Sequence, residues 1–251
     1  MAIDDFIEPQ AFVPASPMTD TVGGLDAETA DFFNTNGYAI LKGHVPLDAL
    51  SRIRTDVEGL VEQNHRSQKD IHLKSDAIGA ALESDLIRGT VERFNGPSEL
   101  LQSFAFTKLP QEVRTKHWHQ DGVYWGLSDS RVCCLFVPMT ATTEDNGCIW
   151  FVPGTHKLGR MYHWVATDEF GLQNLECAMS AFRDPVPMIL EPGDAVIAHT
   201  YTVHGSFHNR TDEPRISLGF HFRHRDTELR LPQPYRKAQA ERLGRDPAAA
   251  A

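Results

Sequence analysis

The sequence lacks long hydrophobic runs and an excess of basic residues. No stretch of about 18 consecutive apolar residues occurs, so no membrane-spanning helix is expected. Lys and Arg number 24 against 34 Asp and Glu, which gives a net charge of −10 over 251 residues. A protein that neutralises the phosphates of a nucleic acid needs an excess of positive charge. The composition therefore argues against nucleic-acid and membrane partners.

The sequence also has few cysteines and no close cysteine pair. None of the four forms the C-x-x-C spacing of many zinc and redox sites. Three of them lie inside apolar runs, so we expect buried free thiols in a reducing compartment. Residues 1–5 lack the basic and apolar regions of a signal peptide, and we expect a cytoplasmic protein. The cysteines are Cys133, Cys134, Cys148 and Cys177.

The overall composition is that of a globular protein. Hydrophobic residues make up 41% and charged residues 23%, and the mean hydropathy is −0.34. A chain of this length can bury one large core. We therefore expect a single domain over residues 1–251.

The first hundred residues carry helical patterns. Residues 1–24 show no sustained period and are expected to form an irregular arm. Residues 25–98 are predicted to form a helical support, because apolar residues recur there at three- and four-residue steps. The expected elements are helices from the N-cap Asp26 to Gly37, from Pro46 onward and over 76–94, and a strand over 38–41.

From about residue 100 the pattern changes to short strands separated by Pro, Gly and Asn turns. Asn146-Gly147 between two apolar runs predicts a hairpin. A run of about eight strands after helices predicts a mainly β protein, a double-sheet jelly roll flanked by helices. A parallel doubly wound sheet is the alternative, but helices do not alternate with the late strands. The strands are expected at 100–107, around 119–121, and at 131–138, 148–152, 187–190, 195–199, 203–207 and 215–223. The jelly-roll core is expected over 99–224, with a lid insertion at 155–186 and a tail at 225–251.

The stretch 118–125 contains half of a metal site. His119 and Asp121 are two residues apart, and in an extended strand such side chains point to the same side. A third ligand can come from His204, which follows the apolar run 195–198. Two histidines and one carboxylate, with open positions opposite, form the pattern of non-haem Fe(II) oxygenases.

An arginine accompanies the third candidate ligand. Arg215 lies eleven positions after His204. If 203–207 and 215–223 form a hairpin, Ser206 lies opposite Arg215. A guanidinium inside a strand-lined cavity needs an anion. A dicarboxylate co-substrate could chelate the metal at one end and pair with Arg215 at the other. The alternative for Arg215 is a surface charge at a strand end.

Other histidines compete for the metal. His204 is favoured because it alone keeps the eleven-residue spacing to the arginine. Two histidines in the predicted lid, His156 and His163, are expected at the surface. The competitors are His117, His199 and His208.

Six short motifs occur in a fixed order in the second half of the sequence. They are His119-Gln120-Asp121, Asn146-Gly147-Cys148, Val152-Pro153-Gly154-Thr155-His156, Pro192-Gly193-Asp194, His204-Gly205-Ser206 and Pro214-Arg215. This series, over about 100–223, resembles the phytanoyl-CoA dioxygenase-like family of Fe(II)/2-oxoglutarate oxygenases. A single H-x-D motif is common, whereas the ordered series is specific.

The resemblance implies an assignment for each of these residues. His119, Asp121 and His204 would be the iron ligands. Arg215 would pair with the 5-carboxylate of 2-oxoglutarate, and Ser206 would assist it. The implied fold is a cupin-like double-stranded β-helix, which is another name for the jelly roll.

The resemblance also implies a reaction. An enzyme of this family uses Fe(II), 2-oxoglutarate and O2 to oxidise a small molecule, with release of succinate and CO2. Hydroxylation is the expected outcome, and desaturation, epimerisation and ring formation use the same ligands. Halogenation is disfavoured because Asp121 keeps the carboxylate that related halogenases lack. The alternative from another class is a jelly-roll protein that binds a metal or a sugar without consuming oxygen.

The expected substrate wall lies on the strand at 100–107 and around it. Its aromatic character predicts an apolar or ring-bearing small molecule, such as a secondary-metabolite intermediate. Phe104 replaces a basic residue of the ectoine-hydroxylating members, so an ectoine-like zwitterion is not expected. The oligomeric state is left open. The predicted substrate residues are Gln102, Phe104, Phe106, Trp125 and Ser217.

Overall fold

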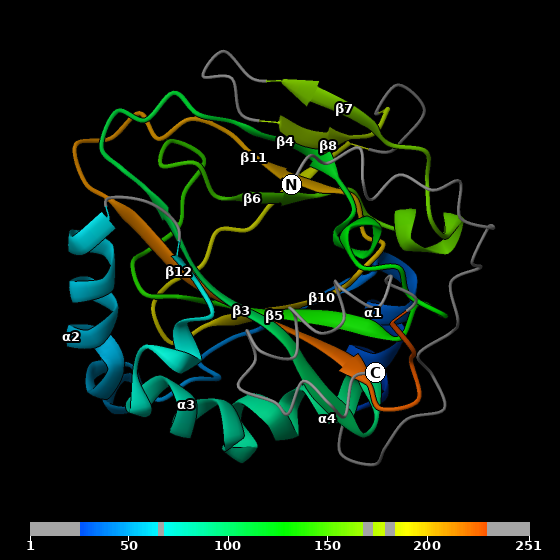
Figure 1. Ribbon diagram of the computed structural model, residues 1–251, viewed down its shortest axis with the longest axis horizontal. Coiled ribbons are helices and arrows are strands. Elements are labelled where there is room, and N and C mark those ends of the chain that lie inside the picture. Colours follow the sequence, from blue (N-terminus) through cyan, green and yellow to red (C-terminus); the bar gives the residue numbers. More distant parts are fainter. Residues whose placement is uncertain (1–25, 65–67, 168–172, 179–183, 230–251) are drawn as a thin grey trace.

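Two antiparallel sheets face each other, and helices cover one of them (Figure 1). This arrangement is the predicted double-sheet jelly roll. The expected arm at 1–24 and the tail beyond Leu229 lie outside the described residues. The computed structural model describes residues 26–64, 68–167, 173–178 and 184–229.

The first helix begins and ends where the sequence predicts, and the second begins where predicted. In α1 (Ala27–Asn36) the Asp26 side chain accepts a hydrogen bond from the Thr29 N–H at 2.7 Å. The helix ends at Gly37, whose φ of 80° suits glycine. α2 (Leu47–Asn64) starts directly after Pro46. Local capping chemistry therefore sets these boundaries.

The single helix expected over 76–94 is divided. α3 (Asp76–Glu83) and α4 (Thr90–Asn95) are separated by Ser84 and a π-helical turn at Asp85–Gly89. Ser84 has an extended backbone, and its hydroxyl donates to the Ala81 carbonyl at 2.5 Å. Such local hydrogen bonds compete with a continuous helix. The apolar period continues across the break, which is why the sequence pattern indicates one helix.

The strands form two main sheets, both antiparallel. The six-stranded sheet has the order β1 (Tyr38–Leu41), β10 (Ala195–His199), β5 (Val132–Pro138), β12 (Arg215–His224), β3 (Ser98–Lys108), β2 (Gln68–Lys69). The four-stranded sheet has the order β4 (Lys116–His119), β11 (His204–Ser206), β6 (Ile149–Phe151), β9 (Val186–Pro187).

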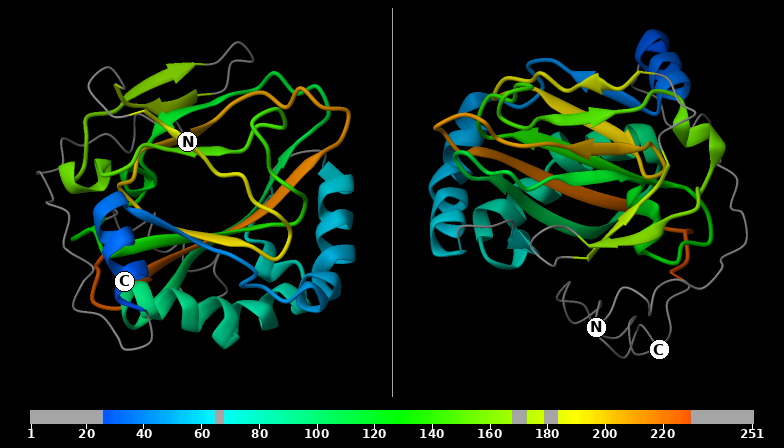
Figure 2. Two further views of the ribbon diagram at one scale, coloured as in Figure 1. Left: turned by 180° about the vertical axis from the view of Figure 1, so that it is seen from behind. Right: turned by 90° about the horizontal axis from the view of Figure 1, so that it is seen from above.

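The six-stranded sheet presents two chemically different faces. On β12, Leu218, Phe220 and Phe222 pack in the core that the helices share with the sheet. The helices lie along this outer face (Figures 1 and 2). Residues at the alternate positions face the second sheet, since side chains alternate along a strand. Arg215 and His221 are among them. The outer face therefore anchors the helices, and the inner face is available for chemistry.

Both hairpins expected from the sequence are absent from the described strands. β11 pairs with β4 and β6, whereas β12 pairs with β3 and β5 in the other sheet. The connections therefore cross between sheets. Asn146-Gly147 does form a turn, with Gly147 at φ 75°. The turn residues determine the local bend, but the sheet that each strand joins is decided by the packing of the whole jelly roll.

The predicted lid contains a small hairpin of its own. β7 (Trp164–Thr167) pairs with β8 (Gln173–Glu176), and β8 lies against β4. The Lys116 ammonium donates to Asn174 Oδ1 at 3.0 Å. The Cys177 N–H donates to the Trp118 carbonyl at 2.9 Å. Its role as a lid stays a prediction.

All four cysteines are buried free thiols, as expected. Burial raises the pKa of Cys148 to about 11 and that of Cys177 to about 12, so these sulfurs stay protonated. In the described part of the chain, no helix has the length and apolar character needed to cross a membrane.

Two histidines that were expected at the surface or near the metal form a buried pair elsewhere. The rings of His156 and His199 lie 5.3 Å apart, and both are less than a tenth exposed. His156 Nε2 donates to the Asn34 carbonyl at 3.1 Å, and His199 Nδ1 accepts from the Tyr201 N–H at 3.0 Å. Burial lowers the pKa of His156 to about 4 and that of His199 to about 3. The pair joins the end of α1 to the end of β10.

This pair predicts a loss of stability in mild acid. Below a pH of about 6.5 the unfolded chain binds protons on these histidines. The folded chain does not protonate His156 until the pH is about 4. Stability is therefore lost as the pH falls, by about 3 kcal/mol for His156 by about pH 4. Denaturant unfolding between pH 7 and pH 4 measures it. His156→Gln keeps a donor for Asn34 and should give a flatter curve; an equally steep curve would contradict the assignment.

Candidate metal centre

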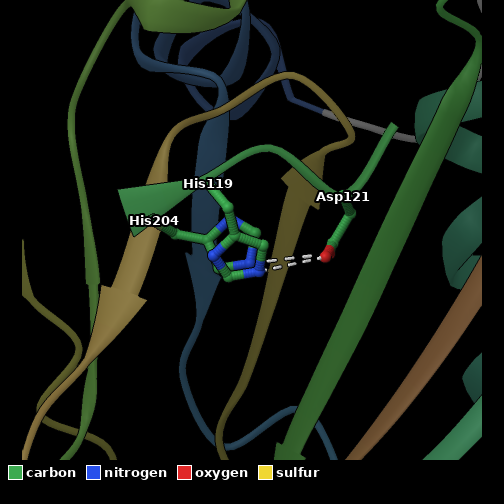
Figure 3. A group of neighbouring side chains, drawn as sticks. All are labelled: His119, Asp121 and His204. Carbon is green, nitrogen blue, oxygen red and sulfur yellow. Dashed lines mark ion pairs between the residues drawn. The ribbon is translucent and has the colours of Figure 1, made fainter. Parts of the chain in front are cut away.

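His119, Asp121 and His204 lie together where β4 ends and β11 begins (Figure 3). His119 Nε2 is 3.5 Å from Asp121 Oδ1, and His204 Nε2 is 3.6 Å from Asp121 Oδ2. One donor atom of each residue lies within 4.8 Å of the others. This spacing suits three ligands of one ion. The structure thus brings the three predicted ligands together.

Asp121 reaches the site by a turn and not along a strand, contrary to the sequence prediction. β4 ends at His119, and a 3-10 turn starts at Asp121. The Gly122 N–H donates to the Thr200 carbonyl at 3.1 Å. A Cβ on Gly122 would lie 2.4 Å from the Tyr201 ring. Glycine therefore allows the turn to pack closely, and the turn moves the carboxylate toward the histidines.

Gln120 clamps this turn, a role that sequence reasoning missed. Its side chain is fully buried and donates to the carbonyls of Gly159 at 2.9 Å and Tyr201 at 2.8 Å. It also accepts from the Met161 N–H at 2.8 Å. The Gln120 N–H donates to His163 Nε2 at 3.0 Å, so His163 is buried and not at the surface as predicted. The position of Gln120 between two ligands is the signal that could have indicated this role.

Hydrogen bonds orient both candidate histidines. His119 Nδ1 donates to the His117 carbonyl at 2.7 Å, and His204 Nδ1 donates to the Thr202 carbonyl at 3.0 Å. A carbonyl only accepts, so each Nε2 of a neutral ring keeps its lone pair. Burial, followed by the charges of His204 and Lys116, lowers the pKa of His119 to about 3. His119 is therefore neutral at pH 7, as a metal ligand must be.

The Asp121 carboxyl is ionised although it is largely removed from solvent. Burial alone would raise its pKa, but the charges of His204 and His221 and the hydrogen bond from His221 hold it well below its usual range. The cluster therefore offers two imidazole nitrogens and one anionic oxygen. This donor set fits divalent iron.

His221 is a second residue that sequence reasoning missed. Its Nε2 lies 2.9 Å from Asp121 Oδ2. The ring is buried on β12, on the sheet opposite His119 and His204. A lone histidine in an apolar strand carries no pattern that distinguishes it, and the tertiary contact alone reveals it.

The competing histidines lie in other surroundings. His117 Nδ1 is 3.0 Å from Glu176 Oε1 on β8, and His199 packs against His156. Among the residues that the structure describes, one group of three His, Cys, Asp or Glu side chains can share an ion, and it is the group above.

Arg215 is a buried cation at the edge of a small apolar pocket. It is 3% exposed, and no carboxylate of the described residues forms an ion pair with it. Its guanidinium donates to Ser217 Oγ at 3.3 Å and to the Gly147 carbonyl at 3.2 Å, and its Nε has no hydrogen-bond partner in the described chain. Burial lowers its pKa to about 10, so it is charged at pH 7. The pocket beside it is lined by Phe136, Pro138, Ile149, Met188, Leu190 and Val196. A buried cation without an anionic partner is energetically costly.

The reasoning that placed Ser206 opposite Arg215 is wrong. Ser206 pairs with Lys116 on β4 and with Ile149 on β6, in the four-stranded sheet. Ser206 is buried. Its assistance to Arg215 stays a prediction.

The predicted substrate residues lie on one wall. Gln102, Phe104 and Phe106 alternate along β3, and Ser217 is the register partner of Phe106 on β12. The rings of Phe104 and Phe106 stack at 4.9 Å. The rings of Phe104 and Trp125 lie 5.5 Å and 5.0 Å from the His221 ring. The wall is therefore linked to Asp121 through His221.

The chain is similar in sequence and fold to known proteins. Phytanoyl-CoA dioxygenase, peroxisomal, from Mus musculus is 25% identical over 231 residues, covering 79% of this chain and 68% of that protein. The fold is shared with EctD from S. alaskensis with bound Fe, with a TM-score of 0.72, 18% identity, and coverage of 88% of this chain and 86% of that chain. It is also shared with the epimerase SnoN in complex with Fe3+, alpha ketoglutarate and nogalamycin RO, with a TM-score of 0.68, 19% identity, and coverage of 81% and 85%.

The family is shown by a match to its family model. The model of the phytanoyl-CoA dioxygenase (PhyH) family matches residues 72–217, which include β3 to β11 and the start of β12. This span contains the three clustered residues and Arg215. Because the match covers more than half of the chain, the protein belongs to the phytanoyl-CoA dioxygenase family and is a dioxygenase.

Proposed function

We propose that this dioxygenase uses Fe(II) and 2-oxoglutarate to hydroxylate a small molecule. The observation that carries the proposal is the convergence of His119, Asp121 and His204. Two imidazoles and one carboxylate would hold the iron and leave positions open for other ligands. The relatives EctD and SnoN are described with iron and with 2-oxoglutarate or alpha ketoglutarate.

Arg215 would hold the far carboxylate of 2-oxoglutarate. It is a buried cation without an anionic partner in the described chain, and its Nε lacks a hydrogen bond. A carboxylate can accept two parallel bonds from a guanidinium. Ser217 Oγ and the Gly147 carbonyl keep the guanidinium in place before the co-substrate arrives. Ser206 is proposed to assist from the opposite sheet.

When bound together, iron and 2-oxoglutarate supply an oxidant made from O2, with release of succinate and CO2, that can remove hydrogen from a nearby C–H bond. The residues of the chain position the substrate and exclude water from the site. Aromatic rings of Phe104, Phe106 and Phe136 line the inner face between the sheets. Excluding water from this space protects the reaction from side products.

Hydroxylation is the proposed outcome, and other outcomes use the same ligands. SnoN is named an epimerase and SnoK a carbocyclase, whereas EctD is described with 5-hydroxyectoine. The position of the substrate C–H bond decides among these reactions. The rings on the wall favour an apolar or ring-bearing molecule, such as a secondary-metabolite intermediate.

A visible absorption spectrum distinguishes the proposed oxygenase from a jelly-roll protein that only binds a metal or a sugar. Anaerobic protein with Fe(II) and 2-oxoglutarate should show the weak visible charge-transfer band of the chelate. A binding protein should show no band. Arg215, which has no anionic partner among the described residues, favours the oxygenase, since a simple metal-binding site needs no buried cation beside it.

Removing any of the three ligands should abolish this band. His119→Ala, Asp121→Ala and His204→Ala each delete one donor atom of a group that fits one ion. His117→Ala is the matched control, because its side chain pairs with Glu176 and its backbone carbonyl is retained. Metal affinity and the band are measured anaerobically. A normal band in His204→Ala would refute the ligand assignment.

Arg215→Leu should weaken 2-oxoglutarate binding and leave iron binding near normal. Loss of a buried charge-assisted pair costs about 2–5 kcal/mol, which corresponds to more than about tenfold in Kd. Titration of the charge-transfer band measures it. Arg54→Leu removes an arginine that pairs with Glu58 on α2 and serves as the control. An unchanged Kd in Arg215→Leu would mean that another cation holds the co-substrate.

Gln102→Ala and Trp125→Ala should uncouple the conversion of 2-oxoglutarate to succinate from the oxidation of the substrate. Both residues lie on the proposed substrate wall, and neither belongs to the group that could share the ion. A substrate displaced by about 1 Å can react on the order of a hundredfold more slowly. Succinate should then form in excess over oxidised product, while iron and 2-oxoglutarate binding stay near normal. The succinate-to-product ratio tests this once a substrate is known, and wild-type ratios and rates in both variants would place the pocket elsewhere.

A further inference from the structure

His221 is the histidine nearest to the Asp121 carboxylate. Its Nε2 lies 2.9 Å from Asp121 Oδ2, whereas the two candidate ligands His119 and His204 lie 3.5 Å and 3.6 Å from the carboxylate oxygens. An ionised carboxylate only accepts hydrogen bonds, so His221 Nε2 is the donor. In the described chain this is the one hydrogen bond made to the Asp121 side chain at normal length from outside the candidate ligand set.

The bond is the main polar contact of the His221 ring. The side chain is 3% exposed, and its other nitrogen, Nδ1, makes no hydrogen bond within the described residues. The ring is surrounded by Phe104 at 5.5 Å, Trp125 at 5.0 Å and Phe136 at 6.3 Å. An apolar ring would fill this space without leaving a buried nitrogen unpaired, which is costly. Compared with such an apolar ring, the imidazole of His221 adds a hydrogen bond to Asp121.

The strand that carries His221 is well supported. β12 lies between β3 and β5, and His221 is the register partner of Gln102 on one side and of Cys134 on the other. Asp121 by contrast starts a short turn. A residue on a doubly paired central strand is therefore holding a residue on a turn. The two histidine ligands are oriented by backbone carbonyls, and Asp121 is oriented by His221.

We infer that His221 is a positioning residue that holds Asp121 in its metal-binding orientation and occupies Oδ2, leaving Oδ1 for the metal. This inference rests on the proposed function. A carboxylate that binds through one oxygen takes one coordination position, which leaves room for a chelating co-substrate. Partners that hold metal ligands in this way contribute about 10- to 100-fold to metal affinity.

The test uses Co(II) as an air-stable substitute for Fe(II), because its visible spectrum reports the coordination number. His221→Phe keeps a ring among the aromatic neighbours and removes the donor. His221→Gln places an amide N–H where it can still donate to Asp121. Cys134→Ala, which alters the register partner on the same face of the sheet, is the matched control. Co(II) affinity, the Co(II) spectrum with and without 2-oxoglutarate, and the melting temperature of the metal-free protein are measured for each.

His221→Phe should fold with a metal-free melting temperature below that of the wild type, because the Asp121 carboxylate loses a charge-assisted hydrogen bond, and His221→Gln should restore most of the difference. Its Kd for Co(II) should rise about 10- to 100-fold, with a changed Co(II) spectrum. His221→Gln should recover most of the affinity and the wild-type spectrum, and Cys134→Ala should match the wild type.

Wild-type affinity and spectrum in His221→Phe would overturn the inference. A loss of affinity that His221→Gln does not reverse, together with a lower metal-free melting temperature in both variants, would also overturn it, since the residue would then be structural. Asp121→Ala separates the two proposals. If it abolishes Co(II) binding while His221→Phe binds normally, the proposed function stands and this inference fails. If the wild type itself binds no Co(II), both fail.

Discussion

The Asp121 carboxylate is contacted by histidines from both sheets, and the geometry of the candidate site depends on these contacts. Two imidazoles approach it from the four-stranded sheet and a third approaches from β12 of the six-stranded sheet. A buried charge is tolerated only where partners surround it. The three histidines supply those partners from both walls, so the site is also a polar link between the two layers of the jelly roll.

β12 organises the inner face around this link. Arg215 stands near its start and His221 further along, on the face turned toward the second sheet. Gly219 lies between them, and a Cβ there would come within 2.6 Å of the Phe106 ring. Because Gly219 has no side chain, the Phe106 ring can pack directly against β12. On the other face, Leu218 and Phe220 pack against the helical core, which keeps the strand in place.

Gln120, which lies between His119 and Asp121, is also fixed by several hydrogen bonds. Gln120 is tied to the 159–161 segment and to Tyr201 by three hydrogen bonds, and its own N–H meets His163. Buried polar groups that are fully satisfied specify one arrangement. The ligand turn is therefore fixed before any metal binds, and the cost of ordering it is met during folding.

The sequence by itself determined many of the local elements and predicted the three candidate ligands that the fold brings together. Helix caps at Asp26 and Gly37 and the alternation of β3 are local, and local chemistry decides them. The ordered series from His119 to Arg215 indicated the donors, because the chemistry of iron restricts the residue types.

Tertiary structure alone decided which strands pair, how Asp121 arrives and which residues support it. The expected hairpin of 203–207 with 215–223 does not form, because the pairing of β11 and β12 depends on sheets built from distant segments. His221 and Gln120 carry no pattern of their own. Their roles come from contacts with residues 39 to 100 positions away, and sequence periodicity holds no information about contacts at that separation.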